Sequence, residues 1–170
     1  QQAGFDLGAA EAPTPSGVGV PTSNVGKKLD FDPDENNIYI TSPTDKKTRE
    51  AISSNPRAIV IGHDLKKFFK ELAQDGQRIK NETFDTMIAA YLLNPDLKDY
   101  DFSKVYYSAF QEMPSEDAQH KPAYLWKLKE YLCEKLKSVD LVKVFENIDM
   151  PLIPVLAEME LYGIKIDTPV

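Results

Sequence analysis

The sequence of 170 residues is poor in cysteine and histidine and has no excess of basic residues. Its one cysteine, Cys133, cannot form an internal disulfide, which is typical of a reducing cytosol. The net charge of −7 argues against a dedicated nucleic-acid-binding protein, because phosphate neutralisation needs clustered cations. The sequence contains neither a run of 18 apolar residues nor a secretion signal, so we expect a cytoplasmic protein without a membrane span.

Several catalytic signatures are also missing from the sequence. It contains no Gly-rich phosphate-binding loop, no Ser-His-Asp arrangement and no zinc-ligand spacing around Cys133. Internal repeats and long heptad runs are absent as well. With 42% hydrophobic and 28% charged residues, the composition is that of an ordinary globular protein, and we expect one domain and a monomer.

Residues 57–95 are the most informative stretch, because they predict a strand followed by two helices. Residues 58–61 form an apolar, mostly β-branched run that is typical of a buried strand. Apolar residues then recur at helical spacing, with Asp64 as the expected N-cap and Gly76 as the stop. The buried face of this helix should comprise Leu65, Phe68, Phe69 and Leu72. The next helix should begin at a cap formed by Asp85 and bury Met87, Ile88, Tyr91 and Leu92.

The flanking regions predict further elements of an α/β domain. Residues 1–26 are rich in Ala, Gly, Pro, Ser and Thr and predict a flexible linker or tail. Two alternating runs, 28–32 and 37–41, predict a β-hairpin, and a capping box predicts a short helix to about residue 54. Helices are expected at 101–111, 122–137 and 139–149, with a last helix at 152–161 after a break or kink at Pro151 and Pro154, closed by Gly163. This order indicates helices covering a sheet.

Two segments of the sequence resemble the family A DNA polymerases, the family of bacterial DNA polymerase I. The first, IGHDLK at 61–66 followed by FDTMIAAYLLNP at 84–95, is similar to the middle of the family's 3′–5′ exonuclease domain. The second, VFENIDMPLIPVLAEME at 144–160 followed by YGIKID at 162–167, is similar to the junction between that domain and the polymerase domain. The resemblance implies an RNase H-like fold, in which helices flank a mixed central sheet whose first strand is reduced or absent. It also implies a tail at 1–26, an exonuclease-like domain at 27–162 and the start of the polymerase junction at 163–170.

The exonuclease motifs of the family are degenerate in this sequence. The family's enzyme holds two divalent metals with four carboxylates. Its second motif, Gly-x-Asn-x-Lys-aromatic-Asp, aligns with residues 62–68 and places Phe68 where a metal-binding aspartate belongs. The nearest match to the first motif, Asp32 with Asp34, lies in an expected turn, and the third motif aligns near Lys121, where no carboxylate stands. We therefore expect no catalytic residue and no metal in this domain; Mg²⁺ is expected only for the polymerase domain, which is absent from these residues.

Two alternatives to an inactive domain stay open. A residual exonuclease with rearranged ligands could hold one metal with His63, Asp64 and Asp85, although helix capping explains both aspartates more simply. A stand-alone interaction module is the other alternative. Independently of these, a modest basic face for DNA could form from Lys66, Lys67 and Lys70, for which a solvated helix surface is the commoner explanation.

Taken together, the resemblance and the motifs predict a catalytically inactive 3′–5′ exonuclease-like domain. Its expected role is to support the polymerase domain of the same chain in DNA replication and repair. The parent protein would then resemble a DNA-directed DNA polymerase, which is a nucleotidyltransferase.

Overall fold

The computed structural model describes residues 37–40, 49, 52, 54–115 and 121–163. Its centre is a sheet of three parallel strands in the order β1-β2-β3: β1 (Asn37–Ile40), β2 (Ile59–Gly62) and β3 (Thr83–Asp85). In the central strand, Ile61 pairs with Tyr39 on one side and with Phe84 on the other. The unbroken apolar run of β2 is explained by this position, since a strand between two parallel neighbours is covered on both faces.

The strands agree with the sequence expectations in part. The run at 37–41 is confirmed as a strand, but it pairs in parallel with β2, and the other half of the expected hairpin, 28–32, lies outside the described residues. The capped helix expected at 42–54 also falls largely on residues that are not described. The strand β3 was not expected, because its three residues are too few to show a periodicity. Within the described residues the sheet is parallel, where a mixed sheet was predicted.

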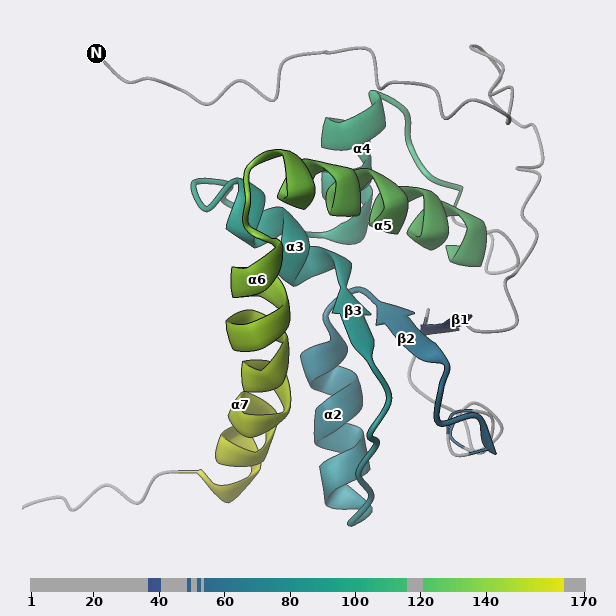
Figure 1. Ribbon diagram of the computed structural model, residues 1–170, viewed down its shortest axis with the longest axis vertical. Coiled ribbons are helices and arrows are strands. Elements are labelled where there is room, and N and C mark those ends of the chain that lie inside the picture. The colour runs from purple at the N-terminus through teal and green to yellow at the C-terminus, as the bar shows by residue number, and fades with distance from the viewer. Residues whose placement is uncertain (1–36, 41–48, 50–51, 53, 116–120, 164–170) are drawn as a thin grey trace, which may run out of the picture.

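The helices lie around this sheet (Figure 1). Helix α2 (Leu65–Gln74) follows β2, and α3 (Thr86–Leu93) follows β3 directly. Helices α4 (Phe102–Phe110) and α5 (Lys121–Ser138) lie beside α3 at the upper end of the view. Their bounds agree with the predicted ranges within one or two residues. Within the described residues, no helix is long and apolar enough to cross a membrane.

The C-terminal helix runs through the two prolines that were expected to interrupt it. It consists of α6 (Val142–Val144), a π-helical turn η1 (Phe145–Asp149) and α7 (Met150–Tyr162), which ends at Gly163 with φ 67°. Of the predicted break or kink, the break is wrong. A π-helical turn stands directly before Pro151, with the Met150 N–H bonded to the Phe145 carbonyl five residues back, and Pro154 lies inside α7. Pro151 then stands in the first turn of α7, where a missing N–H costs little.

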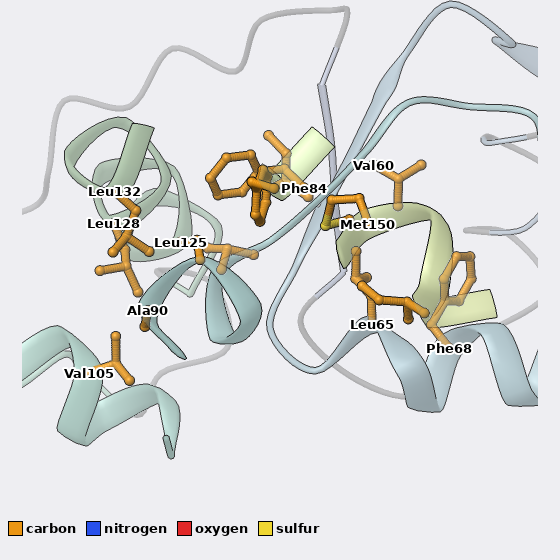
Figure 2. Packing of buried hydrophobic residues seen from close by; sticks show 14 of the residues in the cluster. Val60, Leu65, Phe68, Phe84, Ala90, Val105, Leu125, Leu128, Leu132 and Met150 are labelled. Carbon is orange, nitrogen blue, oxygen red and sulfur yellow. The ribbon is translucent and has the colours of Figure 1, made fainter. Parts of the chain in front are cut away.

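The core has two parts that meet at Phe84 (Figure 2). On one side, Leu65 and Phe68 of α2 lie near Val60 of the sheet and Met150 of α7. On the other, residues of α3, α4 and α5 pack together, and Phe84 stacks on Phe145 with ring centroids 4.9 Å apart. The expected face of α3 is confirmed in part: Ile88 and Leu92 pack against the core, but Tyr91 is 50% exposed. The fully buried residues of this helix are Thr86, Ala89 and Ala90, and α3 packs against α5.

Candidate functional site

Asp85, the last residue of β3, is a buried carboxylate that caps two helices at once. Its Oδ1 accepts hydrogen bonds from the N–H groups of Met87 at 2.8 Å and Ile88 at 3.4 Å, in the first turn of α3. The same carboxylate reaches the start of α2, where Leu65 N–H donates to Oδ2 at 2.7 Å and Asp64 N–H to Oδ1 at 3.1 Å. The adjacent parallel strands β2 and β3 bring these two helix N-termini together. Asp85 therefore satisfies N–H groups that would otherwise be unpaired in the core.

Asp64 does not have the capping role that its position predicted. It precedes α2 but adopts a left-handed conformation, with φ 60° and ψ 56°, and its side chain accepts no capping hydrogen bond from a backbone N–H of α2, a helix that the structure describes in full. Its carboxylate instead pairs with Lys67 Nζ at 2.7 Å. The sharp turn it makes is what brings the start of α2 under Asp85. Aspartate tolerates this conformation better than most residues do.

His63 and Thr86 complete a polar cluster with Asp85, which we call the strand-end cluster. The His63 Nε2 lies 2.7 Å from the Tyr100 carbonyl oxygen, which can only accept, so Nε2 carries a proton. The Thr86 hydroxyl donates to the Gly62 carbonyl oxygen at 3.1 Å, and its oxygen lies 2.9 Å from His63 Nδ1. The cluster thereby joins the end of β2, the start of α3 and the α3–α4 loop.

The electrostatics of the cluster are dominated by burial. Desolvation raises the pKa of Asp85, although the N–H donors of Leu65 and Met87 and the nearby His63 act against the shift. Desolvation also lowers the pKa of His63, and the charges of Asp85, Asp64 and Asp101 and the bond to the Tyr100 carbonyl oppose it. Burial thus disfavours a charge on either side chain.

Phe68 occupies the position at which the sequence comparison expected a metal-binding aspartate, and it lies in the core. It is 3% exposed and belongs to the buried face of α2 with Leu65 and Leu72, as predicted. Phe69, expected on the same face, is only partly buried. Figure 2 shows the Phe68 ring beside the C-terminal helix, among apolar neighbours.

The three lysines proposed for DNA contact are engaged in ion pairs. Lys66 and Lys70 both reach Glu160 on α7, with Nζ–O distances of 2.8 and 3.4 Å, and Lys67 pairs with Asp64. All three lysines lie on one side of α2, as expected. Each has an acidic neighbour that lowers the positive potential DNA would meet.

The polar groups around Phe68 offer few free ligand atoms for a metal. Across residues 54–115, 121–163 and the other described positions, no three His, Cys, Asp or Glu side chains lie close enough to hold an ion. Both Asp85 oxygens already accept N–H groups, and Asp64 is paired with Lys67. Asp32 and Asp34, the nearest match to the first exonuclease motif in the sequence, lie outside the described residues.

The sequence analysis singled out Asp85 and His63 as candidate site residues, but it missed the groups that His63 contacts, the Thr86 hydroxyl and the Tyr100 carbonyl. Thr86 was not considered, because a threonine at the start of a helix is unremarkable in sequence. The Tyr100 carbonyl contributes through the backbone, which leaves no residue-type signal. The helical spacing of the α2 face was the signal that correctly placed Phe68.

Comparisons with known proteins give a consistent set of relatives. No family model matches the chain. It is 34% identical over 125 residues to DNA polymerase I of Bacillus subtilis, covering 61% of this chain and 14% of that protein. It is also 34% identical over 142 residues to DNA polymerase I of Caldicellulosiruptor bescii, covering 81% of this chain and 16% of that protein.

A solved structure shares the fold. The POL domain of Pol1 from M. smegmatis, in complex with DNA primer-template and dNTP, matches with a TM-score of 0.61 and 23% identity, covering 75% of this chain and 24% of that chain. The chain therefore spans only a small part of the proteins it matches. It is similar in sequence to a segment of bacterial DNA polymerase I.

Proposed function

We propose that these residues form a catalytically inactive, RNase H-like 3′–5′ exonuclease-like domain of a DNA polymerase I. Its role is to support the polymerase domain in DNA replication and repair. The similarity to DNA polymerase I and a central sheet flanked by helices support this proposal.

The observation that carries the proposal is the burial of Phe68. A two-metal exonuclease needs oxygen ligands that converge on the phosphodiester. Phe68 stands at the corresponding motif position with 3% of its surface exposed. An apolar ring in the core cannot bind a cation, and Asp85, which accepts from the N–H of Leu65 at the start of the same helix, uses both oxygens to cap helices.

A nuclease assay tests the absence of catalysis. The chain is incubated with single-stranded DNA and millimolar Mg²⁺ or Mn²⁺, and the release of nucleotides from the 3′ end is measured. We expect no metal-dependent degradation above a metal-free control. Degradation that is lost in an Asp85→Asn or Asp64→Asn variant would establish the residual exonuclease with rearranged ligands instead.

The Phe68→Asp variant sharpens this assay by restoring the missing carboxylate. We expect no nuclease activity from it, since one carboxylate does not complete a two-metal site. We also expect it to lose about 4 kcal/mol of stability or more, because a large apolar side chain is removed and a charge is placed in the core. Phe68→Leu, which keeps the site apolar, is the matched control and should lose far less.

Contact between DNA and Lys66, Lys67 and Lys70 remains a prediction. Because these lysines are paired with Glu160 and Asp64, we expect DNA binding by the isolated chain to be weak and strongly dependent on salt. A fluorescence anisotropy titration with primer-template DNA at two salt concentrations measures it. Binding that survives high salt and the charge-reversed variant Lys67→Glu would exclude these lysines as the contact.

A further inference from the structure

Helices α3, α4 and α5 leave an apolar cavity of about 30 Å³ between them. Ala90, Val105 and Leu132, one from each helix, are 3–5% exposed and form its floor. Figure 2 shows these three side chains gathered at the junction of the helices. Two small residues of α4, Ser108 and Ala109, also line the cavity, so α4 fills the junction incompletely. The cavity shares no residue with the strand-end cluster or with the lysines of α2.

The floor of the cavity suits a short aliphatic chain better than water. A single water needs a cavity of about 10–15 Å³ and two to four polar partners. The side chains of the floor are aliphatic, so a water there would gain no hydrogen bond from them. Dry apolar cavities take up apolar molecules, because filling the space restores contacts that the lining side chains lack. On this scale the volume accommodates about two or three carbon atoms.

The charges at the mouth of the cavity offset one another. Asn94 ends α3, Ser108 stands in the last turn of α4 and Lys135 stands in the last turn of α5, and all three are partly exposed. The carboxyl end of a helix carries a partial negative charge of about half a unit, whereas Lys135 carries a full positive charge. The helix ends disfavour a carboxylate and Lys135 disfavours an ammonium, so the mouth favours an uncharged ligand. The Asn94 amide and the Ser108 hydroxyl are side chains of the kind that both donate to and accept from a hydroxyl group.

We propose that this cavity binds one short-chain aliphatic alcohol, with the alkyl chain on the floor and the hydroxyl group at the mouth beside Asn94 and Ser108. The ligand class is therefore a small uncharged molecule with one polar end. A ligand of about four non-hydrogen atoms, such as propan-1-ol, should bind with a Kd of the order of 10 mM. The inference is independent of the proposed function, which concerns the sheet and α2.

A methyl NMR titration of the chain with propan-1-ol tests the proposal. The methyl groups of Val105 and Leu132 lie at the cavity, whereas those of Leu72 on α2 and Ile153 on α7 lie in the other part of the core. We expect saturable shifts at Val105 and Leu132, and only small shifts that rise linearly with the alcohol at Leu72 and Ile153. Propanoate and propylammonium, which have the same chain and opposite charges, should each bind at least about five-fold more weakly.

Two variants change the volume of the cavity in opposite directions. Ala109→Leu fills it and should weaken propan-1-ol binding at least about ten-fold, whereas the matched control Ala73→Leu, on a partly exposed position of α2, should bind as the wild type does. Leu93→Ala enlarges the cavity and should bind pentan-1-ol at least about five-fold more tightly than the wild type does, because more of the chain is buried. This second variant decides the question if Ala109→Leu fails to fold.

Three results would overturn the inference. Shifts at Val105 and Leu132 that rise linearly without saturation would show that the cavity binds no alcohol. Saturable binding that persists in a folded Ala109→Leu variant, or that is unchanged for pentan-1-ol in Leu93→Ala, would place the alcohol elsewhere. Propanoate binding as tight as that of propan-1-ol would assign the cavity to an anion held by Lys135 and would exclude an uncharged ligand class. Metal-dependent DNA degradation would instead contradict the proposed function and has no bearing on the titration.

Discussion

The strand-end cluster and the lysine face of α2 both consist of charged and polar side chains, but the first is buried and the second is exposed to solvent. In the cluster, Asp85 is 1% exposed and each carboxylate oxygen is hydrogen-bonded. On the lysine face, Lys66, Lys70 and their partner Glu160 have side chains that are 40–44% exposed. Buried polar groups are costly when unpaired, whereas exposed ion pairs contribute little. The cluster should therefore determine the fold here, and the lysines should be replaceable.

The largest expected effect is that of Asp85→Ala. This change leaves the N–H groups of two helix starts without an acceptor, so we expect a loss of about 3 kcal/mol in the free energy of unfolding. Urea denaturation measures it. Asp85→Asn, which keeps one carbonyl acceptor, should lose less, and a loss under about 1 kcal/mol for the alanine variant would show that Asp85 is not a shared cap.

The next largest expected effect is a pH dependence of the free energy of unfolding that arises from His63. Burial lowers the pKa of His63, so the unfolded chain, with a histidine pKa of about 6.5, binds this proton more tightly than the folded protein. The contribution of the neutral His63 to the free energy of unfolding is complete above pH 6.5. It is lost as the pH falls from there towards the lowered pKa of His63 in the folded protein, with a slope of at most about 1.4 kcal/mol per pH unit.

Chemical denaturation between pH 5 and 8 measures this slope in the wild type and in His63→Gln. The variant should lose the histidine part of the slope and about 1–2 kcal/mol at pH 7.5, because its amide replaces the two ring contacts incompletely. The raised pKa of Asp85 acts in the opposite direction in both proteins, so the contribution of His63 is read from the difference between the two profiles. Parallel profiles for the two proteins would contradict the proposed linkage.

Replacing Asp64 should change the stability far less than replacing Asp85. Because Asp64 stands at φ 60° and caps nothing, Asp64→Gly should be neutral or should stabilise the protein by about 0.5 kcal/mol. Glycine relieves the left-handed strain, and the lost pairing is to Lys67, whose side chain is 82% exposed. Thermal unfolding checks this, and a loss above about 1 kcal/mol would restore a capping role for Asp64.

The smallest effect is that of Glu160→Gln. The hydrogen bond from Lys66, followed by the charges of Lys66 and Lys70, lowers the pKa of Glu160, yet the pairs are open to solvent. We expect no resolvable change in Tm at physiological salt, and a modest increase in DNA binding as the two lysines are freed. A large drop in Tm would show that the lysine face is structural after all.

Local patterns in the sequence were sufficient for the elements of the fold that depend on nearest neighbours. The apolar run of β2, the α2 face with Phe68 and the bounds of α4 and α5 were all predicted, since each is set by periodicity over a few turns. The buried face of α3 was predicted only in part, because it depends on which of its residues face α5, a distant segment of the chain. The cap of α3 by Asp85 was predicted and is confirmed, whereas the cap of α2 by the same carboxylate was not readable, because Asp64 stood at a suitable position.

The sequence by itself therefore determined most of the helices, the apolar face of α2 that carries Phe68 and the similarity to DNA polymerase I. Tertiary structure alone decided that one carboxylate serves two helix starts and that the C-terminal helix continues past its prolines after a π-helical turn. The physical reason is the same in each case: hydrogen bonds and packing between distant segments depend on their position in space, and periodicity along the chain carries no record of it.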